Sequence, residues 1–224
     1  MTFKLISILS LIFILASCQT NKKTMKGPES SGSKPLYEAK FSEKTTELPD
    51  DFFVMDGNFI PKKLGNNYAI FLVPRPLNTY GCLFGPDSLK GDVVVSADVF
   101  ASKRGRSIPT FGVGSHGLTG FRLYVRAARE GTLVQIVYNE TQVVASASYD
   151  KWTTDTWTSM KLHVKQMGKK VEVYGKAWPQ SENEGDWQVK YSGELPIEEG
   201  QCSFWGIPYS GRDLFFDNLK IEKP

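Results

Sequence analysis

The stretch FRLYVR at residues 121–126 alternates apolar and polar side chains without a break. Two later stretches, MKLHVK at 160–165 and VEVY at 171–174, keep the same period of two. Because successive side chains of a β-strand point to opposite faces, each stretch predicts a strand with one buried and one solvent-facing side. Further strands are predicted at residues 51–55, 68–73, 93–100, 133–138, 142–148, 188–195, 202–207 and 214–221.

Turn-forming residues punctuate these strands every eight to twelve positions, as at Asp56-Gly57 and Asn139-Glu140. No stretch after residue 34 keeps a helical period. Many short strands without a repeat predict an all-β fold, a two-sheet antiparallel jelly-roll sandwich formed by residues 35–224 as a single domain.

The composition limits the classes of protein to which the chain can belong. Its 224 residues are 41% hydrophobic and 12% aromatic, which excludes a disordered chain or a multi-span membrane protein. A net charge of +3 does not indicate a nucleic-acid partner, and two histidines leave little room for a multi-histidine zinc site.

The N-terminus predicts a secretory signal peptide over residues 1–17. Lys4 precedes an apolar run at 5–16, which as a helix would be about 18 Å long and too short for the roughly 30 Å hydrocarbon core. Leu15-Ala16-Ser17-Cys18 resembles a bacterial lipobox, which implies that Cys18 carries acyl chains such as palmitate and anchors the protein in a lipid bilayer.

The residues after Cys18 predict where the protein resides and how it is attached. Gln19 stands where Asp would occur in an inner-membrane lipoprotein, and the resemblance thus implies the outer membrane of a Gram-negative cell envelope, with the periplasmic or surface face left open. Residues 18–34 are rich in Lys, Ser, Thr and Gly and predict a flexible tether.

The C-terminal half resembles a known superfamily. The stretches WTSMKL at 157–162, VEVYGKAWP at 171–179 and FFDNL at 215–219 are similar to the concanavalin A-like lectin/glucanase superfamily. The likeness is to laminin-G-like jelly rolls and, more loosely, to 3-keto-disaccharide hydrolase domains. It implies a sandwich over about residues 45–222, and a structural calcium ion held by Asp217 as the one cofactor to consider.

Cys82 and Cys202 remain after Cys18 is lipidated, and an oxidising envelope favours a disulfide between them. The alternative is that both are buried as small apolar residues.

The polar side of the stretch 121–126 is the candidate ligand site. Arg122, Tyr124 and Arg126 share one face, and Tyr138 is expected on a neighbouring strand. Planar guanidinium groups and aromatic rings are typical of carbohydrate sites, although the same residues also suit an ordinary solvated face. Four residues of predicted loops complete the expected rim: Trp152, Trp205, Tyr209 and Arg212.

Catalytic candidates are few. The E-x-D-x-x-E pattern that laminarinase-type glucanases carry is absent, and the acidic run at 182–186 is expected to be an exposed hairpin loop. His163 is expected at the surface. His116, in a glycine-rich loop predicted at 112–117, is the best candidate for a general base, and a plain loop residue is the alternative.

These observations lead to one functional hypothesis and two alternatives. We expect a membrane-anchored lipoprotein whose sandwich binds carbohydrate without catalysis. The alternatives are a glycan-active hydrolase or lyase that uses His116 and the arginines, and a structural or protein-interaction module of the envelope. The oligomeric state and the identity of the glycan are left open.

Overall fold

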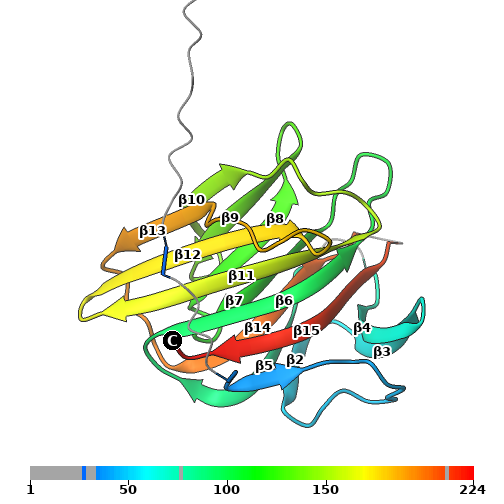
Figure 1. Cartoon of the computed structure of the whole chain (residues 1–224), viewed down its shortest axis with the longest axis horizontal. Helices are drawn as coiled ribbons and strands as arrows, with labels where there is room; N and C mark the ends of the chain where they lie inside the picture. The colour runs from blue at the N-terminus through cyan, green and yellow to red at the C-terminus, as the bar shows by residue number, and fades with distance from the viewer. Residues whose placement is uncertain (1–26, 29–33, 76–77, 210–211) are drawn as a thin grey trace, which may run out of the picture.

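The computed structural model describes residues 27–28, 34–75, 78–209 and 212–224. Within them the chain forms fifteen β-strands in two sheets that pack face to face, and all pairings between these strands are antiparallel (Figure 1). The expected all-β sandwich is therefore confirmed. The predicted signal peptide and Cys18 lie outside the described residues.

The eight-stranded sheet lies toward the viewer in Figure 1. A short strand, β1 (Tyr37–Ala39), pairs with β15 beside the main order. That order is β13 (Val189–Gly193), β12 (Lys170–Pro179), β11 (Thr156–Met167), β6 (Val93–Ala101), β15 (Leu214–Glu222), β4 (Asn67–Leu72) and β3 (Phe59–Leu64).

The seven-stranded sheet packs behind it and carries the candidate site. Its strands are, in spatial order, β10 (Gln142–Ser148), β9 (Thr132–Tyr138), β8 (Phe121–Ala127), β7 (Thr110–Ser115), β14 (Gly200–Ile207), β5 (Tyr80–Leu89) and β2 (Phe52–Asp56).

An aromatic cluster fills the space between the sheets at one end of the core. The ring of Phe204 lies 4.7 Å from Phe216, 5.3 Å from Phe59 and 5.9 Å from Phe84, measured between centroids. Phe204 and Phe84 come from the seven-stranded sheet, and the other two rings come from the eight-stranded sheet. Offset and edge-to-face ring pairs of this kind add to the free energy gained by apolar burial, so they join the two layers.

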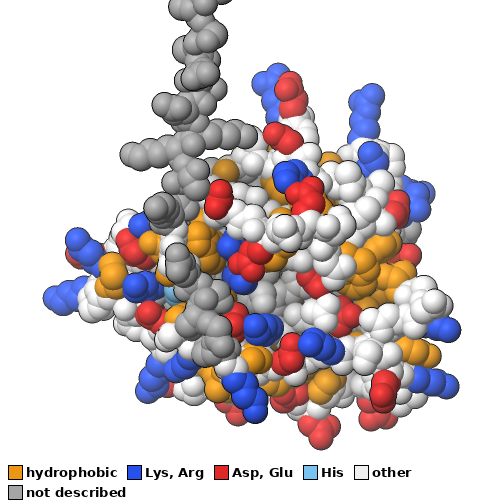
Figure 2. Space-filling model, viewed as in Figure 1, with side chains coloured by type: hydrophobic (Ala, Val, Ile, Leu, Met, Phe, Trp, Pro, Cys, Tyr) orange, Lys and Arg blue, Asp and Glu red, His pale blue; other side chains and the backbone are white. Residues whose placement is uncertain are grey.

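The outer face of the eight-stranded sheet has a mixed character (Figure 2). Phe71, Phe215, Phe100 and Trp157 stand directly opposite one another on four neighbouring strands and form a cross-strand aromatic row. Elsewhere on this face basic and acidic side chains are interspersed, which agrees with the small net charge.

The prediction of a glycine-rich loop at 112–117 is wrong for its first four residues. Residues 112–115 belong to β7, which pairs with both β8 and β14 in the middle of the seven-stranded sheet. The composition concealed this strand because glycine is depleted in strands. His116 and Gly117 follow with positive φ values of 65° and 72° and turn the chain away.

The expected disulfide is also wrong, because Cys82 and Cys202 are both free thiols. They lie on the adjacent strands β5 and β14, but Cys82 is opposite Phe204 and Cys202 is opposite Phe84. The Cα atoms of two residues in such diagonal positions are about 7–8 Å apart, which is too far for a disulfide without backbone movement. Both thiols are fully buried, so the alternative of two small core residues is the one observed.

Burial also affects the reactivity of these thiols. Burial raises the pKa of each to about 12, which leaves them protonated at neutral pH. In the described part of the chain, no helix has the length and hydropathy needed to span a bilayer.

Candidate functional site

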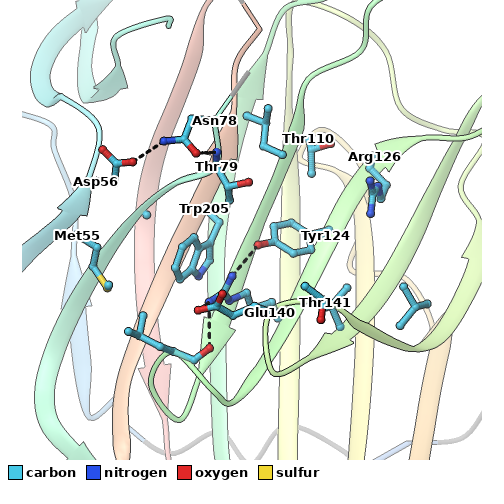
Figure 3. A pocket seen from close by; sticks show the side chains of 16 residues that line it. Met55, Asp56, Asn78, Thr79, Thr110, Tyr124, Arg126, Glu140, Thr141 and Trp205 are labelled. Carbon is cyan, nitrogen blue, oxygen red and sulfur yellow. Dashed lines mark hydrogen bonds and ion pairs between the residues drawn. The ribbon is translucent and has the colours of Figure 1, made fainter. Parts of the chain in front are cut away.

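A groove of about 600 Å³ lies on the outer face of the seven-stranded sheet (Figure 3). Trp205 and Tyr124 form its floor, with Asp56 and Asn78 on one side and Arg126 on the other. Its lining runs from Met55 and Asp56 of β2 to Val143 of β10, so it crosses the strands of the sheet.

Side-chain alternation places the polar residues of β8 in this groove. Phe121, Leu123 and Val125 are fully buried between the sheets, and the intervening Arg122, Tyr124 and Arg126 therefore point outward. The prediction that these three share an outward face is confirmed by the geometry. Arg122 and Tyr124 are nevertheless only 3% and 5% exposed, because they lie deep in the groove.

Three glycines on neighbouring strands make room for these large side chains. A Cβ atom at Gly81 would overlap the Trp205 ring, and one at Gly112 would come within 2.7 Å of Tyr124 Cδ1. At Gly114 a Cβ would overlap the Ser203 hydroxyl and lie 3.3 Å from Arg122 Cγ. The floor of the groove therefore requires glycine on β5 and β7.

Arg122 is the central group of the floor. Its guanidinium carbon lies 3.6 Å from the centroid of the Trp205 ring, a close cation–π stack. Nη2 donates to the Leu118 carbonyl at 3.0 Å, and Nη1 approaches the Tyr124 hydroxyl at 3.5 Å. The nearest carboxylate is that of Glu140, 3.5 Å from Nη2, and the buried Nε has no hydrogen-bond partner among the described residues.

The remaining floor groups are held in place. The Trp205 indole N–H donates to Ser203 Oγ at 2.7 Å, which fixes the ring against the sheet. Burial raises the pKa of Tyr124, with Arg122 opposing, so its hydroxyl keeps its proton at neutral pH and can donate it into the groove.

The rim carries both signs of charge. Arg126 is exposed and donates to Gln135 Oε1 at 3.0 Å, which leaves other guanidinium N–H groups for a ligand. Asp56 accepts from Asn78 Nδ2 at 2.6 Å and from the Gly57 N–H at 2.7 Å. Glu140 follows Asn139 in the β9–β10 turn, where both residues have positive φ, and this turn places its side chain beside Arg122.

His116 does not belong to the groove, and the structure does not support it as a general base. It is 1% exposed, its Nδ1 lies 2.9 Å from Ser115 Oγ, and its Nε2 lies 3.0 Å from the Gly91 carbonyl. Burial lowers its pKa despite the opposing Gly91 carbonyl. A neutral ring with both nitrogens paired has no free position for a substrate proton.

The expectation of a surface position for His163 is wrong as well. It is 3% exposed on the outer face of the eight-stranded sheet, where the rings of Tyr174 and Trp187 lie 6.2 and 6.3 Å away. The acidic run beside it forms the β12–β13 hairpin loop, as predicted. Glu184 of that loop bridges Lys161 and Lys176 at 2.6 and 2.7 Å.

Tyr138 and three of the four predicted rim residues are not part of the groove. Tyr138 has the wrong parity for the outer face: it pairs with Phe121, stacks on that ring at 5.0 Å, and donates to the Pro196 carbonyl. Trp152 lines a separate hollow beside Thr132. Tyr209 and Arg212, between β14 and β15, are not among the described residues that line the groove. Of the four expected rim residues, Trp205 alone is among the described residues that line the groove, and it lies in the floor.

Asp217 serves the fold. Its carboxylate accepts from the Phe41 N–H at 3.1 Å, the Asn218 N–H at 2.7 Å and Asn67 Nδ2 at 3.4 Å. In the ranges that the structure describes, no three His, Cys, Asp or Glu residues gather to hold a metal ion. These nitrogen donors do not fit calcium, which takes six to eight oxygen ligands.

Sequence reasoning missed several residues of the site. Glu140, Leu118 and Asp56 contribute to the groove, as do the glycines beneath its floor. The stretch TFGVGS at 110–115 did contain a signal for strand β7 and its glycines, because Phe111 and Val113 alternate with small residues there.

Comparisons with known proteins support the fold. No protein-family model matches the chain, and no curated protein matches it. Among solved structures, the Emp47p carbohydrate recognition domain covers 87% of this chain and 99% of its own, with a TM-score of 0.58 and 10% identity. The carbohydrate-binding module CBM66 from Bacillus subtilis covers 77% and 96% (TM-score 0.53, 14% identity).

A plant lectin is similar to the same extent. Lectin I-B4 from Griffonia simplicifolia, in its metal-free form, covers 83% of this chain and 98% of its own, with a TM-score of 0.57 and 8% identity. The chain thus has the two-sheet sandwich of lectins and carbohydrate-binding modules, and at these identities the likeness concerns the fold.

The burial of His116 predicts a pH dependence of stability. Its folded pKa lies below the value of about 6.5 for an unfolded chain, so below that pH the unfolded state binds more protons. The free energy of unfolding should therefore decrease as the pH falls from about 7.5 to about 5.5, as measured by urea denaturation.

His116→Asn is the matched variant, because asparagine tolerates the φ of 65° at this position. The lowered pKa of His163, also caused by burial, is retained in the variant, so the difference between the two proteins isolates His116. An unchanged pH dependence in the variant would contradict this assignment.

Proposed function

We propose that the groove binds carbohydrate and that the protein has no catalytic activity of its own. The observation that carries the proposal is the composition of the floor and walls, where hydrogen-bonding groups lie among apolar surfaces. The guanidinium of Arg122 and the protonated hydroxyl of Tyr124 offer donors, and Met55 and Val143 offer apolar contact. Sugars present this combination of hydroxyl groups and C–H faces.

The nature of the floor defines how a sugar would be held. Arg122 covers a face of the Trp205 ring, so the edge of the guanidinium and the Tyr124 hydroxyl meet the ligand ahead of the indole face. Thr110 and Thr141 add hydroxyl groups to the lining. The fold shared with the Emp47p carbohydrate recognition domain and the carbohydrate-binding module CBM66 adds support.

The positions of the carboxylates support a binding role without hydrolysis. The groove's described lining includes two carboxylates, Asp56 at the end of β2 and Glu140 between β9 and β10. Four strands lie between β2 and β9, and the two carboxylates have separate partners: Asp56 accepts from Asn78 and Gly57, and Glu140 pairs with Arg122. A glycosidase instead directs an acid and a base at one bond, with the two groups about 5–9.5 Å apart. The hydrolase alternative also loses His116, since that ring is buried.

A variant of the rim tests the binding site. Arg126→Ala removes an exposed guanidinium, and we expect it to weaken glycan binding roughly five- to twentyfold, the effect of losing about one solvent-accessible hydrogen bond. A glycan array identifies the ligands, and titration calorimetry with the best of them measures the affinity.

Arg212→Ala is the matched control, because it removes an exposed arginine outside the groove lining and should leave the affinity unchanged. Failure of the protein to bind any glycan on the array would refute the proposed function and favour the interaction-module alternative.

We further propose that the protein is a lipoprotein anchored to the outer membrane through acylated Cys18. The described residues give one structural indication of how the domain would be oriented. Gly27, in the predicted tether, packs against Trp187, which lies with Tyr174 and His163 on the outer face of the eight-stranded sheet. The groove is on the opposite sheet, so this arrangement would direct it away from the side on which the tether arrives.

The anchor is tested by Cys18→Ala. The variant should move from the membrane fraction to the soluble fraction and lose its acyl mass, as measured by detergent partition and intact mass spectrometry. A native protein without acyl mass on Cys18 would overturn the anchor and leave the carbohydrate site unaffected.

A further inference from the structure

Arg122 is a buried cation whose pairing within the protein is incomplete. Its side chain is 4% exposed, yet Glu140, 57% exposed, is the one carboxylate within 4 Å of it among the described residues, at 3.5 Å. Its Nε has no partner there, and Nη1 reaches the Tyr124 hydroxyl only at 3.5 Å. Buried guanidinium groups are normally satisfied by close, often two-pronged contacts with a carboxylate. Arg122 therefore has pairing capacity that the protein leaves unused.

The position of Glu140 makes the existing ion pair easy to exchange. Glu140 lies in the three-residue turn between β9 and β10, at the wall of the groove, with its side chain largely in solvent. A pair of this length with one exposed partner contributes little to stability. A ligand carboxylate arriving from the groove would meet Arg122 in a less hydrated setting and could approach it more closely than Glu140 does.

The remaining charges indicate which part of the groove would receive an anion. Asp56 is at the β2 end, where its carboxylate is hydrogen-bonded to Asn78 and Gly57. Arg126 lies four residues beyond Arg122 on β8, about 13 Å along the strand. Both guanidinium groups thus come from β8, with that of Arg122 extending over Trp205 of β14, and Glu140 is the carboxylate to be displaced there.

We propose that the ligand of this groove is an acidic glycan, and that the carboxylate of a uronic acid residue replaces Glu140 as the partner of Arg122. This inference rests on the proposed carbohydrate-binding function and specifies its ligand class. A carboxylate suits the site because it has the planar shape of the group that it displaces and matches the fork of the guanidinium. The contact of Arg122 with the Leu118 carbonyl is retained.

The experiment uses oligomers of galacturonate, mannuronate and hyaluronan, each compared with the same oligomer after its carboxylates have been reduced to alcohols. Titration calorimetry with the parent protein should show binding of at least one acidic oligomer. The affinity for its reduced form should be weaker by roughly tenfold or more. The affinity for the acidic form should fall as salt is added, because the interaction is between charges.

Glu140→Gln provides the sharper test. It removes the competing carboxylate and keeps the shape of the side chain, so binding of the acidic oligomer should tighten roughly three- to tenfold, and by clearly more than any change in binding of the reduced oligomer. Glu182→Gln, which removes an exposed carboxylate outside the groove lining, is the control and should change neither affinity.

The outcomes separate this inference from the proposed function. Equal or tighter binding of reduced or neutral oligosaccharides, or no tightening in Glu140→Gln, would overturn the uronate assignment and leave carbohydrate binding in place. If neither acidic nor neutral oligosaccharides bind, the proposed function fails and this inference fails with it.

Discussion

The stack of the Arg122 guanidinium on the Trp205 ring is the interaction on which the rest of the site depends. It exists because Gly81, opposite Trp205 on β5, has no Cβ atom to lift the indole from the sheet, while Gly112 of β7 leaves the space beside Tyr124. Any larger residue at Gly81 would displace the ring, and Arg122 would lose the surface that covers it. The floor of the groove is thus determined by residues that contribute no side chain.

Burial of a cation in a sheet face has a free-energy cost that the surrounding structure must offset. Arg122 regains part of it through Trp205 and the Leu118 carbonyl, and a smaller part through the exposed Glu140. The aromatic core around Phe204 supports the site from beneath, because it joins the strand that carries Trp205 to the opposite sheet. A rigid sandwich with an incompletely paired cation at its surface is well suited to binding.

The sequence predicted those features that side-chain alternation controls. The parity of residues 121–126 placed Arg122, Tyr124 and Arg126 on one outward face, and the same rule predicted the strands around residues 160 and 171. The glycine-containing strand β7 was missed, because glycine is depleted in strands and its presence obscured the alternation of Phe111 and Val113. Tyr138 and His116 were misplaced, because their surroundings depend on register and on a turn with positive φ.

Fluorine NMR of 5-fluorotryptophan-labelled protein tests most directly whether ligand binds over Trp205 on the seven-stranded sheet. The chain has five tryptophans, and substitution of each by phenylalanine assigns its resonance. On titration with an oligosaccharide that binds, we predict a shift of the Trp205 resonance, while that of Trp187, on the outer face of the other sheet, stays in place. A shift of Trp187 with Trp205 unchanged would contradict it.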